Sequence, residues 1–377
     1  MKTLHVHIGT PKTGTTSIQN FCVDNEKLLE KQGYCYPLFP YSYKSVAKVR
    51  NGHFLFGMIT DENGTRDKEK EAANYKGGMQ KLHELFRTYD NIILSDEDIW
   101  RHMDQTKKTL MAELKEEADK SGFALHIIVY LRRQDKFMSS LWNQQIKQGT
   151  LTQYTFDEYY AQVNREVRLD YYGKLEHLSS IVGKENITVR RFESNRFEGG
   201  NIYADFLSAI GLTLTGEYNI KQDILNTGLY GNTHEIKRLL NVFPEMKERS
   251  VRVFFIESLR KCAPSSEKNY PCDMYSQEEI AQMLDYYGDD NRKVAKEYLH
   301  EPGAELFDNT IKDLPKWEKD NPYLLDDIVR FVGASSISLF QENQELKKEI
   351  AELKKFAEHA RHPFRTLLRR IKRIFVH

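Results

Sequence analysis

The stretch Leu4-His-Val-His-Ile-Gly-Thr-Pro-Lys-Thr-Gly-Thr-Thr-Ser17 decides the fold of this 377-residue chain. Its first residues alternate apolar side chains with His5 and His7, as a strand does, and Ile18 to Gln32 has the apolar spacing of a helix. A turn that contains glycine lies between the two. The segment therefore predicts a strand, a tight turn and a helix, which is the unit from which parallel sheets are built.

Three further apolar runs of strand length follow, at Asn91 to Ser95, Ala124 to Leu131 and Asn186 to Phe192. Helices are predicted around them, at Met79 to Tyr89, Met111 to Lys120, Asp135 to Gln148 and Tyr203 to Ile210. Continuous apolar strands that alternate with helices are typical of a parallel sheet covered on both faces. We therefore expect an α/β fold, a P-loop-like parallel sheet flanked by helices, with a helical C-terminal extension.

The composition excludes several classes of protein. The chain has 55 Lys+Arg against 55 Asp+Glu, which argues against a generic nucleic-acid binder. No apolar run approaches the roughly 18 residues of a membrane span. The N-terminus lacks the apolar centre of a signal peptide, and the four cysteines lack CxxC spacing, so we expect neither secretion, a disulfide framework nor a zinc site.

The first turn predicts an anion site. A loop that opens a helix points several backbone N–H groups at one place, where the helix dipole also favours negative charge. The loop differs from a Walker A motif because threonines follow Gly14 where Lys and Ser/Thr are required. The alternative is a tight connection whose hydroxyls only cap the helix. The residues of the predicted site are Lys12, Thr13, Gly14, Thr15, Thr16 and Ser17.

A second candidate site follows the strand predicted over Ala124 to Leu131. Arg132 comes directly after this strand, and Ser140 stands eight residues further on, past the start of the next helix. An arginine fork and a serine hydroxyl can close on one phosphate. The alternative is an arginine in surface salt bridges beside an ordinary helical serine.

Together, Pro11-Lys-Thr-Gly-Thr-Thr16 and Tyr130-Leu-Arg132-Arg133 with Ser140 resemble the sulfotransferases that use 3′-phosphoadenosine 5′-phosphosulfate (PAPS), in particular their bacterial carbohydrate-type branch. The resemblance extends loosely over residues 3 to 308. It implies that the first loop holds the 5′-phosphosulfate, that Arg132 and Ser140 hold the 3′-phosphate, and that no metal is needed.

The transfer of a sulfuryl group requires a base for the acceptor hydroxyl and positive charge at the leaving phosphate. Lys12 is placed by its loop to carry that charge. In the resemblance, Glu97 falls where relatives have a catalytic His or Glu, and His53 is the second candidate for the base. The alternatives are that Glu97 is a solvated acidic residue at the end of a strand and that His53 is a structural histidine.

The sequence thus predicts a PAPS-dependent O-sulfotransferase. The resemblance alone implies a carbohydrate acceptor, on a surface or lipid-linked glycan. An ATP-dependent P-loop kinase with a metal site at Asp96 is one alternative, and a membrane-tethered nucleotide-binding scaffold without catalysis is another. The tyrosine cluster between Tyr154 and Tyr172 fits either sugar stacking or helix packing.

We expect one α/β domain over residues 1–335, with residues 36–90 as an insertion over the acceptor side. Residues 336–360 are predicted to form a short helical segment, in which Leu346, Ile350 and Leu353 make only about two heptads, too few to predict a coiled coil.

The tail, residues 361–377, has six Lys/Arg and no acidic residue, which leaves 49 basic against 55 acidic residues in the rest. Its basic amphipathic pattern predicts contact with an anionic membrane surface, or else with a protein partner. A cytoplasmic location at the inner face of the membrane is therefore expected.

Overall fold

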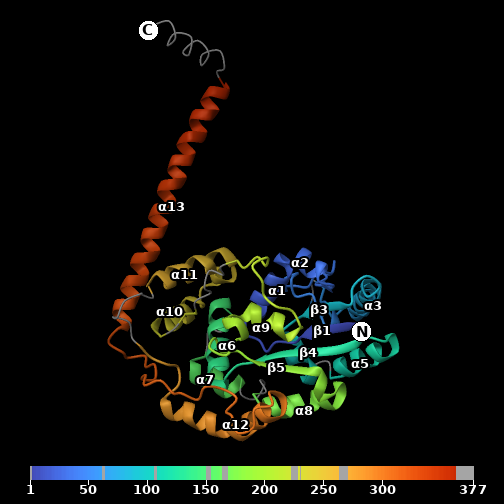
Figure 1. Cartoon of the computed structure of the whole chain (residues 1–377). Coiled ribbons are helices and arrows are strands. Elements are labelled where there is room, and N and C mark those ends of the chain that lie inside the picture. Colours follow the sequence, from blue (N-terminus) through green and yellow to red (C-terminus); the bar gives the residue numbers. More distant parts are fainter. Residues whose placement is uncertain are drawn as a thin grey trace. The chain divides into compact units, whose positions relative to one another are not determined.

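The computed structural model describes residues 2–61, 64–105, 108–149, 154–163, 169–221, 228–229, 231–262 and 271–361. The chain forms two compact units, both visible in Figure 1. Unit 1 comprises residues 1–144, 153–228 and 273–316, and unit 2 comprises residues 145–152, 229–272 and 317–377. Apart from its first residue, the predicted basic tail lies outside the described residues, and the predicted division at residues 335 and 360 stays a prediction.

Unit 1 is built on a parallel sheet of five strands in the order β2-β3-β1-β4-β5. The α/β fold predicted from the sequence is therefore confirmed. The strands are β1 (Thr3–His7), β2 (Tyr34–Cys35), β3 (Asn91–Ser95), β4 (Ala124–Leu131) and β5 (Ile187–Arg191).

The middle strand, β1, has a neighbour on each side, and its side chains are buried on both faces. His5 and His7 lie within this packing. One ring nitrogen of His5 contacts His126 at 2.9 Å, and Nδ1 of His7 lies 2.9 Å from the Ser95 hydroxyl. Burial lowers the pKa of His7 to about 3, so this histidine is a neutral core residue.

Helices cover both faces of this sheet (Figure 1). One face packs against α1 (Thr15–Asp24), α2 (Glu26–Lys31) and α9 (Ile202–Ala209). The other packs against α3 (Lys68–Leu85), α5 (Leu110–Ser121), α8 (Tyr171–Val182) and α12 (Gln277–Tyr298). The remaining helices of the α/β part are η1 (His53–Leu55), α4 (Asp98–Gln105), α6 (Gln134–Gln148), α7 (Phe156–Val163), η2 (Lys184–Asn186) and η3 (Glu198–Gly200).

The structure differs from the sequence predictions at four places, of which two are corrected helices and two are elements that were not predicted. The helix expected over Ile18 to Gln32 is broken at Asn25, whose side-chain amide donates to the carbonyls of Phe21 and Asn219. The helix expected from Met79 already begins at the start of α3, where Asp67 caps it by accepting the Lys70 N–H. The strand β2 and the helix α4 were not predicted at all.

Unit 2 is helical. Its helices are α10 (Asn232–Leu240), η4 (Pro244–Lys247), α11 (Arg249–Cys262) and α13 (Leu324–Arg361). A small core joins them, in which Phe331 of α13 packs against Phe255 of α11 with their ring centroids 6.0 Å apart. Among the described residues, no helix combines the length and the apolar character that crossing a membrane requires.

Candidate active site

The carboxyl ends of β1, β3 and β4 bring three loops to one edge of the sheet. β1 lies between the other two, and the chain continues from β1 to the β2–β3 side before it crosses to β4. Such a reversal in strand order marks the place where open α/β sheets bind their ligands. The residues that follow these strands here are the loop 8–14, then Asp96 and Glu97, and then Arg132.

The loop after β1 forms an open cradle of backbone N–H groups. Gly9, Lys12 and Gly14 have positive φ angles of 79°, 67° and 74°, which turn the chain sharply before α1. Within the part of the chain that the structure describes, the N–H groups of residues 12–17 donate to no acceptor. Unpaired N–H groups at a helix N-terminus, beside the positive end of its dipole, favour an anion.

Two glycines make this loop possible. A Cβ atom on Gly9 would lie 2.8 Å from Cα of Glu97, and one on Gly14 would overlap the side chain of Ile202. Both residues also need the left-handed backbone conformation that glycine tolerates best. The close approach at Gly9 brings the backbone of Glu97 directly against the loop.

Two positive charges meet at the cradle. Nη1 of Arg132 donates to the backbone carbonyl of Lys12 at 3.0 Å, and the Tyr171 hydroxyl fixes the backbone by donating to the carbonyl of Arg132 at 2.6 Å. Burial and the charge of Arg132 lower the pKa of Lys12, whereas Glu97 opposes this shift. Neither cation has an ion-pair partner among the described residues. Two such cations side by side are stabilised by a bound anion.

The other residues predicted to bind the cofactor differ in what they contribute. The Thr13 hydroxyl donates to the carbonyl of Thr10 at 2.5 Å, so it stabilises the loop itself. Ser140 lies half-buried in α6, and no contact joins it to Arg132 in the described residues. The pairing of Arg132 with Ser140 on one phosphate therefore stays a prediction.

The candidate base Glu97 lies beside the cradle. Nε2 of Gln19, from α1, donates to Oε2 of Glu97 at 3.1 Å, and Nη1 of Arg50 lies 3.5 Å from Oε1. Burial raises the pKa of Glu97, while the charge of Arg50 opposes the rise. A carboxylate with a raised pKa is better matched to accept a proton near neutral pH than an exposed one.

The second candidate base, His53, is held by the neighbouring carboxylate. Its Nδ1 lies 2.9 Å from Oδ2 of Asp96, and its ring lies between those of Tyr43 and Phe56. Asp96 is fully buried and also accepts two hydrogen bonds from Arg50, at 3.0 and 2.5 Å. The structure thus brings both candidate bases to the same edge of the sheet. Arg50 lies near Glu97 and binds Asp96, which in turn contacts His53.

Sequence reasoning missed Arg50 and Gln19. The insertion carries Arg50 to the carboxyl end of β3 because Asn51 is anchored there: its amide donates to the carbonyls of Pro37 and Ile93 and accepts the Ser95 N–H. The only local signal was that Arg50 stands three residues before His53.

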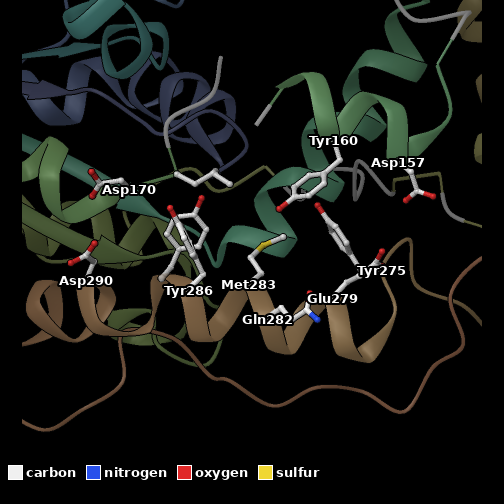
Figure 2. Close-up of a pocket in the computed structure, with 11 residues that line it drawn as sticks. Asp157, Tyr160, Asp170, Tyr275, Glu279, Gln282, Met283, Tyr286 and Asp290 are labelled. Atoms are coloured by element: carbon white, nitrogen blue, oxygen red, sulfur yellow. The ribbon is translucent and has the colours of Figure 1, made fainter. Parts of the chain in front are cut away.

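A cavity of about 760 Å³ lies in unit 1 beside α12 (Figure 2). In Figure 2 the hydroxyls of Tyr160 and Tyr275 point toward the same space above this helix. The Tyr275 hydroxyl is buried and has no hydrogen-bond partner among the described residues. The lining residues are Asp157, Tyr160, Leu169, Asp170, Tyr275, Glu279, Gln282, Met283, Tyr286, Tyr287 and Asp290.

Each carboxylate that lines this cavity already has a hydrogen-bond or ion-pair partner. Nζ of Lys316 donates to Asp157 at 2.9 Å and to Glu279 at 2.8 Å. Asp290 pairs with Lys293 at 2.8 Å. Asp170 accepts the Gly173 N–H at 2.7 Å as the N-cap of α8. The walls therefore offer aromatic faces and hydrogen-bond acceptors without a strong excess of negative charge.

The cavity adjoins the carboxyl edge of the sheet. Asp170 lines it, and the next residue, Tyr171, is the one that donates to the carbonyl of Arg132. At the start of α6, Gln134 donates to Asn291 of α12 at 3.0 Å. These contacts place one end of the cavity next to the arginine of the cradle.

No protein-family model matches this chain. An uncharacterized protein from Archaeoglobus fulgidus is 27% identical over 184 residues, which cover 46% of this chain and 45% of that protein. The chain thus matches less than half of that relative's length. Among solved structures, the chain is similar to a sulfotransferase from Alicyclobacillus acidocaldarius, with a TM-score of 0.35 and 13% identity over 66% of this chain and 98% of the other.

Proposed function

We propose that this chain is a PAPS-dependent O-sulfotransferase. The observation that supports this function most is the cradle of residues 12–17, whose N–H groups find no acceptor among the described residues and lie beside Lys12 and Arg132. Bound there, PAPS would supply an activated sulfuryl group. The cradle would hold its 5′-phosphosulfate, and Arg132 with Ser140 would hold its 3′-phosphate.

Two side chains would take part in the transfer. Glu97 accepts the proton of the acceptor hydroxyl as the oxygen attacks sulfur. Lys12 would supply positive charge to the oxygen that links sulfur to the departing phosphate, where negative charge develops as that bond breaks. The pKa of Lys12 is lowered by burial, yet the ammonium form is the one this role requires.

Glu97 is preferred to His53 as the base because of its neighbours. The charge of Glu97 reaches Lys12, and its backbone contacts the cradle at Gly9. His53 is bound to Asp96 and enclosed by two aromatic rings, an arrangement that suits a residue which positions the edge of the site.

The kinase alternative fits the site less well. It needs Asp96 as a ligand for a divalent cation, as the sequence alone suggested. In the structure, the oxygens of Asp96 accept hydrogen bonds from Arg50, His53 and the backbone N–H of Asp98. A second cation there would face the guanidinium of Arg50. The scaffold alternative depends on the tail, which lies outside the described residues.

For the acceptor, we propose a neutral saccharide that occupies the cavity beside α12. Tyrosine rings stack on the apolar faces of sugars, and paired carboxylates still accept hydrogen bonds from sugar hydroxyls. The Tyr275 hydroxyl, which has no partner among the described residues and whose pKa is raised by burial, is a neutral donor or acceptor for such a group. Among the described residues that line the cavity none is basic, so an acidic saccharide would find no cation to pair with there, and acidic saccharides are disfavoured.

Replacing Tyr286 with alanine tests this acceptor site. Tyr286 is 79% exposed, so its loss leaves the fold intact. We expect the KM for a neutral oligosaccharide to rise about three- to tenfold while the KM for PAPS is unchanged, since one stacking contact is lost. The measurement is the transfer of labelled sulfate from PAPS across a panel of neutral and acidic saccharides.

The matched control is Tyr323→Ala, which removes an exposed tyrosine of unit 2 and is expected to change neither constant. An unchanged acceptor KM in Tyr286→Ala, or a preference for acidic saccharides, would contradict the acceptor assignment and leave the cofactor assignment standing.

A further inference from the structure

Helix α13 carries an apolar stripe that no described residue of unit 2 covers. Residues 339–358 are exposed on every side in the described part of the chain. The large apolar side chains of the stripe are between 49% and 70% exposed. Contiguous apolar surface of this extent on a soluble unit marks an interaction site. The residues concerned are Leu325, Val329, Val332, Leu339, Leu346, Ile350 and Leu353.

The stripe follows a heptad repeat. Its positions alternate by four and three residues from Leu325 to Ala360, which spans five heptads and about 54 Å at 1.5 Å per residue. The a positions are Val329, Ser336, Asn343, Ile350 and Ala357. The d positions are Leu325, Val332, Leu339, Leu346, Leu353 and Ala360.

The stripe is free of the contacts that α13 makes within its own unit. Asp327, Phe331 and Ser335 are the buried residues of the helix, and Phe331 packs against α11. At about 100° per residue, Asp327 and Phe331 lie on the side of the helix away from the a and d positions, whereas Ser335 lies at a g position, beside the stripe. From residue 339 to residue 358 every residue of the helix is exposed, so a second helix can pack along this part of the stripe while α11 stays in place.

We propose that α13 pairs with α13 of a second copy of this chain in a parallel, two-stranded coiled coil. Leucine dominates the d positions, and the larger apolar residues at a are the β-branched Val329 and Ile350, a combination that favours two strands. A single asparagine at a, here Asn343, fixes the register and the number of strands at some cost in stability.

The charges that flank the stripe determine the orientation. Glu342 and Glu349 occupy g positions, and Lys347 and Lys354 occupy the e positions five residues later. In a parallel pair, each g residue faces the e residue of the following heptad on the other helix, so every glutamate meets a lysine. In an antiparallel pair, glutamates would face glutamates and lysines would face lysines.

Sedimentation of the full chain tests the pairing. At about 10 μM we expect a dimer, and the double variant Leu346→Asp, Leu353→Asp should be a monomer with unchanged far-UV circular dichroism from units 1 and 2, because two core layers then hold four carboxylates. The control is Ile337→Asp, which adds one aspartate to an exposed residue of the same helix outside the stripe. This control should remain a dimer.

Charge reversal tests the orientation. Glu342→Lys with Glu349→Lys should weaken the dimer about tenfold or more, because attractive pairs become repulsive. Adding Lys347→Glu and Lys354→Glu to that variant should restore wild-type affinity. An affinity unchanged by the first pair of substitutions would overturn the parallel arrangement.

Three results would overturn the pairing itself. They are a monomeric wild-type chain at about 100 μM, a trimer, and a dimer that survives Leu346→Asp with Leu353→Asp. None of them depends on the proposed sulfotransferase activity, which belongs to residues of unit 1.

Discussion

Replacing Glu97 with glutamine is expected to lower turnover with PAPS by about a thousandfold, because the amide keeps the shape and hydrogen bonds of the side chain but cannot accept the acceptor's proton. Gln19 can still contact the new side chain, so the loop geometry is preserved. The measurement is kcat with saturating PAPS and acceptor. The affinity for 3′,5′-adenosine bisphosphate, measured in parallel, should be unchanged.

The comparison variant is His53→Ala, for which we expect a loss of tenfold or less, through displacement of Asp96 and Arg50. If His53→Ala lowers kcat about a thousandfold and Glu97→Gln stays active, then His53 and not Glu97 is the base. If both variants stay active, neither residue is the base.

The pH dependence of catalysis is expected to follow from the ionisation of Glu97 and Lys12. Glu97 must be ionised to act, and burial raises its pKa above the ordinary 4.5, so the acid limb of kcat/KM should lie above that value. Lys12 must be protonated, and burial lowers its pKa below 10.5, so the alkaline limb should lie below that value. Glu97→Gln should remove the acid limb from the residual activity.

Replacing Arg132 with alanine is expected to weaken the binding of 3′,5′-adenosine bisphosphate about a hundredfold, since charge-assisted hydrogen bonds to a phosphate are lost. The guanidinium also contacts the cradle itself, by donating to the carbonyl of Lys12. Isothermal titration calorimetry of the metal-free protein measures the change.

The matched variant is Arg132→Lys, which retains the charge but loses the planar guanidinium. Its affinity for the bisphosphate should lie between those of the wild type and Arg132→Ala. Arg196→Ala, elsewhere in unit 1, should bind as wild type does. Unchanged affinity in Arg132→Ala would show that the 3′-phosphate lies elsewhere, whatever the fate of the first loop.

The parts of the fold that the sequence predicted are those with local signals. The first strand shows an alternation of side chains, followed by a glycine-containing turn, and the structure has a strand and a turn there. In contrast, β2 has only two residues and gives no periodic pattern. The strand exists because Tyr34 and Cys35 pair with Asn91 and Ile92, which are far away in sequence.

The candidate site shows the same division. The cradle is one continuous segment and was predicted from its residues, but the arrangement around Asp96 joins residues that are 43 and 46 positions apart. The sequence pattern also did not predict the hydrogen-bond partners of single side chains. The Thr13 hydroxyl, predicted as a phosphate donor, is used within the loop, because the carbonyl of Thr10 lies in reach.

The heptad repeat of α13 escaped detection because polar residues interrupt it. Ser336 and Asn343 occupy core positions, so the apolar pattern alone covers only about two heptads around Ile350. Once the helix is known to run without a break from Leu324 to Arg361, the same residues extend the repeat over its whole length.

The proposed function requires that the cradle after β1 binds the sulfotransferase cofactor. Its most direct test is calorimetry of the wild-type chain with 3′,5′-adenosine bisphosphate in the presence of a chelator, compared with ATP in the presence of Mg²⁺. We expect tight binding of the bisphosphate without metal and at least tenfold weaker binding of Mg-ATP. Tight binding of Mg-ATP with no detectable binding of the bisphosphate would contradict the proposed function.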